Sequence, residues 1–176
     1  MRIFGIDPGS QVTGFGCVDT DGGRHRLVEC GAIATAEDAA FPEKLLTIHT
    51  RLAAAIAACR PDCVAIENLF YATNVRTALK LGHARGVAML AATMAGVPVV
   101  EYSPAEIKRA LVGFGRAEKH QVQHMVKLML GLADLPSPHD AADALAVAIC
   151  HAHSRPPSAI ERPSGRQATS WRHYRP

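Results

Sequence analysis

Apolar and polar positions along the chain follow two spacings, one typical of strands and one typical of helices. Short apolar runs bounded by turn residues predict five strands, at 2–7, 14–19, 27–34, 63–67 and 97–102. Apolar residues three and four positions apart predict helices at 42–58, 75–95, 104–112, 119–130 and 140–153. Three strands followed by alternating helices and strands predict an α/β fold, a mixed central β-sheet flanked by α-helices.

The predicted elements end near residue 153, and the composition changes there. With 176 residues, the chain is long enough for one hydrophobic core and too short for two ordinary domains. We therefore expect one domain at 1–153. Residues 154–176 are rich in Pro, Ser and Arg and contain almost no aliphatic side chains, so we expect a disordered basic C-terminal tail.

The charge distribution limits how the chain would contact nucleic acid. The net charge is +3, and residues 154–176 carry five Arg and one Glu, so the rest of the chain has a charge of about −1. Any nucleic-acid surface on the domain must therefore be a local patch. Five cysteines without a CxxC motif indicate reduced thiols, and no signal peptide or membrane-spanning run is present, so we expect a cytoplasmic protein.

Two predicted strands end on a carboxylate, which is costly at a buried position unless it meets a metal, a partner or solvent. Asp7 ends the run IFGI, and Glu67 ends CVAIE. Strand-end acids of one α/β sheet can converge on the crevice at the strand ends. The alternatives are a turn-initiating Asp and an ordinary exposed Glu.

A second acidic pair lies in the segment HDAADALAVAIC. Asp140 and Asp143 are three residues apart, so they share one face of a helix, and the alanines between them let that face approach the sheet. Asp140 has the alternative role of an N-cap. Four hard oxygen ligands favour Mg²⁺ or Mn²⁺. A pair of such cations ~3.5–4 Å apart suits phosphodiester hydrolysis.

Histidines offer a competing metal site. His120 and His124 are four residues apart on a predicted helix, and His151 and His153 lie near the last helix. No HExxH or CxxC motif accompanies them, so surface or capping roles are favoured over zinc.

Four segments together resemble the RuvC family of crossover-junction endodeoxyribonucleases. They are GIDPGSQVTGFG, AIENLFYATNVRTALKLGHARGV, EYSPAEIKRALVGFGRAEKHQVQHMV and HDAADALAVAICHAH, in consistent order from about residue 2 to 153. The resemblance implies a ribonuclease H-like fold and a metal-dependent nuclease that resolves Holliday junctions by paired nicks in homologous recombination and DNA repair. It assigns catalysis and metal binding, with two Mg²⁺ per site or Mn²⁺ as a substitute, to Asp7, Glu67, Asp140 and Asp143. His139 creates an ambiguity of register beside Asp140.

Aromatic and basic residues supply candidate DNA contacts. Phe70 and Tyr71 follow Glu67 in a polar loop, where an aromatic ring could stack on an unpaired base or fold back on the core. The resemblance assigns stacking to Phe70. Basic side chains near the 113–118 loop and at the start of the long helix are candidate phosphate contacts: Arg76, Lys80, Lys108, Arg109, Arg116 and Lys119.

Partners follow from the reaction and from the resemblance. A four-way junction must be cut on two strands, so a symmetric homodimer is expected. The helix at 75–95 offers an apolar stripe for it, with Leu79, Gly82, His83, Gly86 and Met89, unless this helix is buried in its own domain. The resemblance also implies the RuvA–RuvB branch-migration complex as a partner.

Three other functions remain open. FGIDPGSQVTGFG is similar to the phosphate loop of the actin and sugar-kinase superfamily, but those proteins need a second lobe. A nuclease acting on RNA or another branched substrate is the second, and a catalytically dead DNA-binding module is the third. The acidic quartet argues against the dead module.

Overall fold

A five-stranded mixed sheet runs through the centre of the protein in the computed structural model, which describes residues 1–68 and 74–154. The strand order is β3-β2-β1-β4-β5. Strands β1, β2 and β3 pair antiparallel, and β1, β4 and β5 pair parallel. Their bounds are Arg2–Asp7 (β1), Val12–Asp21 (β2), Arg24–Ala34 (β3), Cys63–Glu67 (β4) and Val99–Tyr102 (β5). The predicted α/β fold with a mixed sheet is confirmed.

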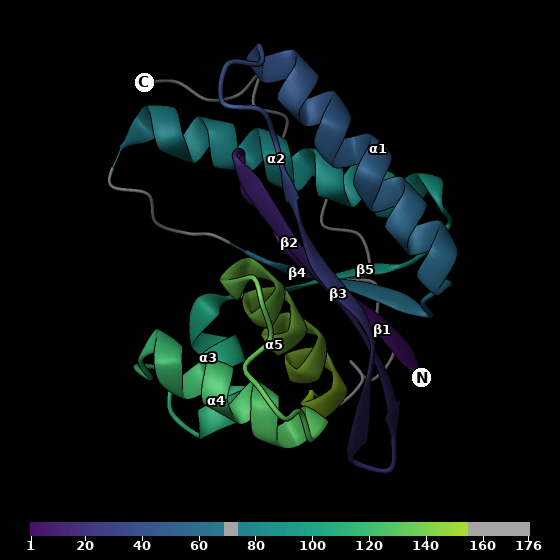
Figure 1. Cartoon of the computed structure of the whole chain (residues 1–176), viewed down its shortest axis with the longest axis vertical. Coiled ribbons are helices and arrows are strands. Elements are labelled where there is room, and N and C mark those ends of the chain that lie inside the picture. The colour runs from purple at the N-terminus through teal and green to yellow at the C-terminus, as the bar shows by residue number, and fades with distance from the viewer. Residues whose placement is uncertain (69–73, 155–176) are drawn as a thin grey trace, which may run out of the picture.

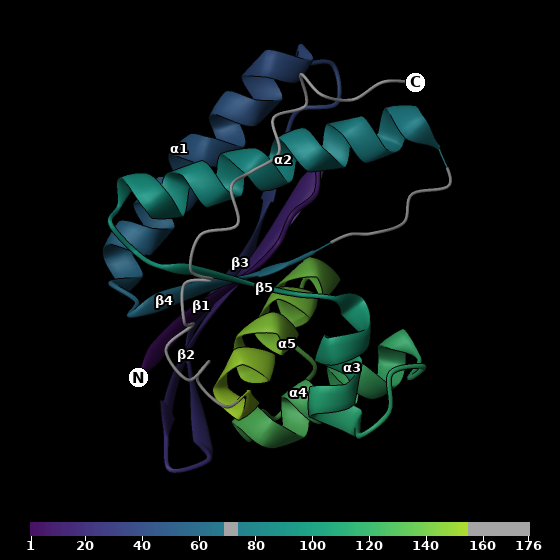
Figure 2. The same cartoon turned by 180° about the vertical axis from the view of Figure 1, so that it is seen from behind.

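Helices cover both faces of this sheet, as Figures 1 and 2 show. One face carries α1 and α2, and the other carries α3, α4 and α5. Strand residues alternate between the two cores, so that Ile3 packs with the second group of helices and Phe4 with the first. The helix bounds are Phe41–Cys59 (α1), Val75–Met94 (α2), Pro104–Val112 (α3), Lys119–Leu130 (α4) and His139–His153 (α5).

Helix α5 lies directly on the sheet because three glycines remove side chains from the contact. A Cβ atom at Gly5 would lie 2.0 Å from the carbonyl oxygen of Ala144, and one at Gly14 would lie 2.0 Å from that of Asp140. A Cβ atom at Gly16 would lie 2.6 Å from the side chain of Leu145. No larger residue fits at Gly5 or Gly14 without moving the helix backbone. The glycines therefore set the height of α5 above β1 and β2.

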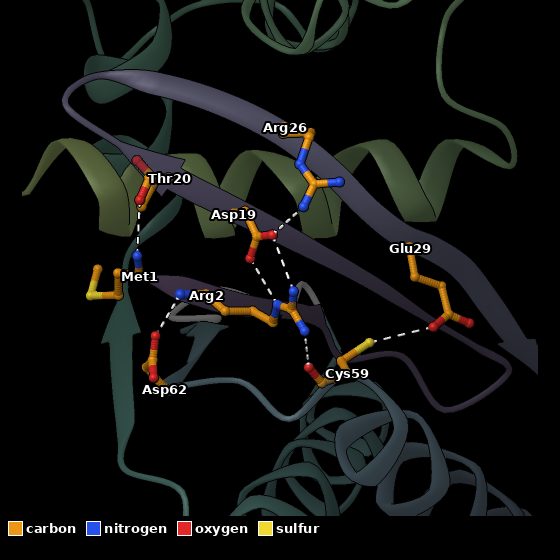
Figure 3. Close-up of polar contacts among 8 residues, drawn as sticks. All are labelled: Met1, Arg2, Asp19, Thr20, Arg26, Glu29, Cys59 and Asp62. Atoms are coloured by element: carbon orange, nitrogen blue, oxygen red, sulfur yellow. Dashed lines mark hydrogen bonds and ion pairs between the residues drawn. The ribbon is translucent and has the colours of Figure 1, made fainter.

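A polar network fixes the beginning of β1, as Figure 3 shows. The Arg2 guanidinium donates hydrogen bonds to Asp19 on β2 and to the carbonyl of Cys59 at the end of α1. The backbone N–H of Arg2 donates to Asp62, 2.6 Å away. Arg26 on β3 also contacts Asp19, so three strands and α1 are tied together at this end. The network pins β1 at the end opposite Asp7.

The observed bounds differ from the predicted ones by one to three residues at several element ends. Strand β2 ends later and β3 begins earlier than expected, because both continue into a hairpin turned by Gly22 and Gly23, both at positive φ. Helix α5 begins at His139, and its N-cap is Pro138. The alternative role of Asp140 as an N-cap is therefore wrong, because Asp140 lies within the first turn.

Two further findings concern the cysteines and the membrane. All five cysteines are free, as expected for reduced thiols. Within 1–68 and 74–154, no helix combines the length and apolar content needed to cross a membrane.

Candidate active site

Two acidic side chains lie next to each other at the ends of neighbouring strands. Strands β1 and β4 pair in parallel with Ile6 opposite Ile66, so Asp7 and Glu67 follow on adjacent strands at the same edge of the sheet. Both strands are buried up to these residues, and both acids are half-buried. The sequence-based expectation that the two strand-end acids converge is confirmed.

The first turn of α5 brings two more acids to this edge. Asp7 pairs with Gly14 across β1 and β2, and the backbone of Asp140 packs on Gly14. Asp143, one turn further along α5, lines a cavity of ≈ 340 Å³ together with Asp7 and Glu67. Asp140 lines the neighbouring cavity instead. Three of the four predicted acids therefore share one cavity, and the fourth stands at its border.

The cavity raises the pKa of two carboxyl groups, those of Asp7 and Glu67. Burial, followed by the negative charges of Glu67 and Asp143, raises the pKa of Asp7 to about 8. Burial is also the largest cause that raises the pKa of Glu67, whereas hydrogen bonding with Asp7 acts in the opposite direction. At neutral pH the acids therefore hold a shared proton when no cation balances their charge.

A lysine supplies positive charge to this cluster. The ammonium of Lys119, at the start of α4, lies 2.6 Å from a carboxylate oxygen of Asp143. This hydrogen bond raises the pKa of Lys119, so the side chain stays protonated. Lys108 on α3 lines the same cavity. Both residues were among the predicted phosphate contacts.

The carboxylates of this site have the chemistry of ligands for a hard divalent cation, but they do not surround a common point. In the part of the chain that the structure describes, no three Asp, Glu, His or Cys side chains are arranged to hold a metal. Asp143 is instead turned to Lys119. The chemistry fits, because oxygen donors and an uncompensated cluster of negative charge favour Mg²⁺ or Mn²⁺.

The six predicted basic contacts do not form one patch. Arg109 faces a different hollow, beside Tyr102. Arg76 and Lys80 lie on α2, which covers the opposite face of the sheet from α3 and α4. Arg116 is exposed in the connection between α3 and α4. Phe70 and Tyr71 lie outside the described residues.

Three of the four histidines considered for zinc contact other side chains. His120 lies 3.3 Å from Glu118, while His151 contacts the hydroxyl of Tyr102 at 2.7 Å and His153 contacts His25 at 2.9 Å. His139 is exposed, whereas its neighbour Asp140 is half-buried. The burial difference favours Asp140 over His139 as the site residue.

The glycines that bring α5 to the strand ends were not among the predicted functional residues. Gly14 and Gly16 alternate on β2, and glycine within a strand indicates a close approach of another backbone. The spacing of these two glycines could have indicated the helix contact from the sequence. Phe41 and Lys44, which line the neighbouring cavity with Asp140, were also not predicted.

The architecture is that of the ribonuclease H-like fold, with acids at the ends of adjacent central strands. A structure of Thermus thermophilus RuvC in complex with a Holliday junction substrate superposes with a TM-score of 0.83, at 38% identity, covering 87% of this chain and 93% of that one. The yeast mitochondrial Holliday junction resolvase Ydc2 shares the fold alone, with a TM-score of 0.59 and 11% identity over 86% of this chain and 78% of that one.

Residues 3–151 match the family described as crossover junction endodeoxyribonuclease RuvC. The RuvC protein of Chloroflexus aggregans is 53% identical over 156 residues, covering 89% of this chain and 95% of the relative. That of Trichlorobacter lovleyi is 48% identical over 179 residues, with both chains fully covered. The chain belongs to the RuvC family of crossover junction endodeoxyribonucleases, which are DNA-cutting hydrolases.

Proposed function

We propose that this protein resolves Holliday junctions by hydrolysing one phosphodiester in each of two strands with the help of divalent cations. The observation that carries the proposal is the cavity at the strand ends, where Asp7, Glu67 and Asp143 meet two lysines. The related Thermus thermophilus enzyme was seen with a Holliday junction substrate. The reaction would serve homologous recombination and DNA repair.

The acids Asp7, Glu67, Asp140 and Asp143 are the proposed metal ligands. Two Mg²⁺ ions, or Mn²⁺ in their place, would supply an activated water and stabilise the leaving oxygen when bound. The buried strand ends and the glycine contact at Gly14 fix the acids before DNA arrives. The raised pKa of Asp7 means that this carboxyl must release a proton to become a ligand.

The lysines at the cavity have a separate part in the proposal. Lys108 and Lys119 provide positive charge beside the acids, where the phosphodiester would lie. Lys119 holds Asp143 through a 2.6 Å contact and would exchange this carboxylate for a phosphate oxygen. The Lys119 ammonium, once it no longer binds Asp143, would stay in the cavity and stabilise the negative charge of the phosphate.

Paired nicks require two sites, and the outer face of α2 offers a surface for a second copy. The side chains of Leu79 and Leu90 are 60% and 51% exposed. They border an apolar groove that also includes Gly82 and Gly86, where an added Cβ would meet nothing within 4 Å. The core is instead contacted by the alanines of α2: Ala84, Ala88, Ala91 and Ala92. Four residues of the predicted stripe are exposed, whereas Met89 is half-buried against the core. The exposure of the four favours a homodimer over burial of the helix in its own domain.

Other expectations rest on the sequence and on the family alone. They are an association with the RuvA–RuvB complex, a cytoplasmic location, and a domain at 1–153 followed by a basic tail.

The substrate can be tested with a panel of 5′-labelled nucleic acids of matched sequence. We expect Mg²⁺-dependent cutting of a mobile four-way junction at symmetric positions, and little cutting of linear duplex or an RNA hairpin. EDTA should abolish the reaction. Equal cutting of duplex and junction would contradict the proposal, as would cutting of one junction strand only.

A further inference from the structure

A larger cavity of ≈ 680 Å³ adjoins the candidate active site and shares Asp140 with it. Its walls are the turn after β1, the beginning of α1 and the beginning of α2. Two lysines line it, Lys44 from α1 and Lys80 from α2. The smaller cavity, lined by Asp7, Glu67 and Asp143, also has a pair of lysines, Lys108 and Lys119. Each of the two cavities therefore combines predicted acids with two lysines.

An aromatic ring holds one of these lysines. The ammonium of Lys80 lies 5.8 Å from the centroid of the Phe41 ring, a distance typical of a cation–π contact. The ring of His83 packs against the same ring in a T-shaped arrangement, with 5.7 Å between the two centroids. The two contacts orient the Phe41 ring, and the ring in turn supports the ammonium of Lys80.

The opposite wall of the cavity is preformed. The hydroxyl of the buried Thr13 donates to the carbonyl of Gly9 at 2.7 Å, and the backbone N–H of Thr35 donates to the carbonyl of Gln11 at 2.9 Å. The ammonium of Lys44 donates to the carbonyl of Glu37 at 2.9 Å, which places it at the rim. Binding of a ligand against this wall would therefore not include the entropy cost of ordering a loop.

The charges of the cavity select a ligand class. Lys44 and Lys80 face one carboxylate besides Asp140, that of Glu37. If Asp140 serves the metal, a single net positive charge remains, which suits a phosphodiester better than a doubly charged phosphomonoester. We propose that this cavity binds a backbone phosphate of the cleaved DNA strand, adjacent to the phosphate that is cut. The inference rests on the proposed function, because it assumes that the acids act on DNA.

The consequence is a path for the scissile strand. The strand would run from Lys108 and Lys119, across the acids, to Lys44 and Lys80. The reacting phosphate at Lys108 and Lys119 and the neighbouring phosphate at Lys44 and Lys80 would both be fixed, so that the reacting phosphate stays in register with the acids. Phe41 is then a positioning residue, which acts through Lys80.

Methylphosphonate substitution can test this path phosphate by phosphate. Junctions are prepared with one neutral methylphosphonate at each position flanking the cut, and single-turnover rates are measured against enzyme concentration. We expect one position beside the cut at which the neutral linkage weakens wild-type binding by about tenfold, the usual loss for one charge-assisted contact. The same position should have no further effect on the double variant Lys44→Met, Lys80→Met.

Matched variants distinguish phosphate binding by Lys44 and Lys80 from a nonspecific effect of positive charge on DNA binding. Arg51→Met removes an exposed cation of α1 that does not line the cavity and should leave the pattern unchanged. The double variant Lys44→Arg, Lys80→Arg should restore binding, and Phe41→Leu should fall between wild type and the double methionine variant. Thermal melting confirms that each variant folds.

Each outcome decides the inference. If the double methionine variant remains sensitive to every methylphosphonate, or binds the unmodified junction as tightly as wild type, the cavity does not hold a phosphate. A wild-type protein that cuts no junction would instead overturn the proposed function, so the two failures are distinguishable.

Discussion

Gly14 provides a perturbation that moves the acids without changing any of them. A Cβ atom at this position would lie 2.0 Å from the carbonyl oxygen of Asp140 and 2.5 Å from its carbonyl carbon. Ordinary contact begins at 3.4 Å, so in Gly14→Ala the start of α5 must move away from β2 by more than 1 Å. The obstructing atoms are backbone, and a side-chain rotation cannot relieve them.

The displacement should cost activity far more than stability. Overpacking of this kind costs ~1–3 kcal/mol, which leaves a domain of this size folded at 25 °C. A misplacement of ~1 Å at a site that depends on positioning lowers the rate about 10²-fold. We therefore expect the single-turnover rate of junction cutting in Mg²⁺ to fall about a hundredfold, while junction affinity in Ca²⁺ changes little.

Gly16→Ala is the matched control. Its Cβ would lie 2.6 Å from the side chain of Leu145, which follows Asp140 and Asp143 along α5, and 3.1 Å from the Leu145 backbone N. The cost in stability should be similar, but the first turn of α5 stays in place. If Gly14→Ala cuts within threefold of wild type, or if Gly16→Ala loses as much activity as Gly14→Ala at equal melting temperature, the first turn of α5 does not position the acids through Gly14.

Four further outcomes can be measured. Without metal, the free energy of unfolding should fall as the pH rises from about 4 to about 8. The folded state raises the pKa of Asp7 above its ordinary value of 3.8, so over this range it binds a proton that the unfolded state has lost. By calorimetry, Asp7→Asn should therefore melt at a higher temperature than wild type at pH 8 in EDTA. Lys119→Met should bind Mg²⁺ more tightly in titration calorimetry, because the ammonium no longer competes for Asp143, yet should cut junctions more slowly. Leu79→Glu should sediment as a folded monomer, where the wild type gives about twice the 18.8 kDa chain mass, and should nick only one strand. Truncation after Ser154, whose hydroxyl binds the end of α5, should keep the melting temperature and weaken salt-sensitive DNA binding.

The sheet and its strand-end acids were predictable because each was encoded locally. Buried strands read as apolar runs, and Asp7 and Glu67 interrupt such runs at their ends. Parallel pairing of β1 with β4 then brings the two acids together, which is a general property of this class of sheet.

The distribution of the basic residues was not predictable in the same way. Lys80 and Lys119 carry the same charge in similar helical surroundings, yet α2 and α4 cover opposite faces of the sheet. Which face a helix covers depends on its crossover connection and not on its own sequence. The cavity of Lys44 and Lys80 likewise assembles from three separate segments, so no single stretch of sequence reveals it.

The acids themselves are tested most directly by conservative neutral variants on a four-way junction. Asp143→Asn, Asp7→Asn and Glu67→Gln are compared with Asp134→Asn, an exposed acid outside both cavities, in single-turnover cutting with Mg²⁺ at saturating enzyme. We expect the three site variants to lose cutting by at least about 10³-fold and still to bind the junction, since the proposed phosphate contacts are lysines, whereas Asp134→Asn should cut normally. Cutting by any of the three at near the wild-type rate would contradict it.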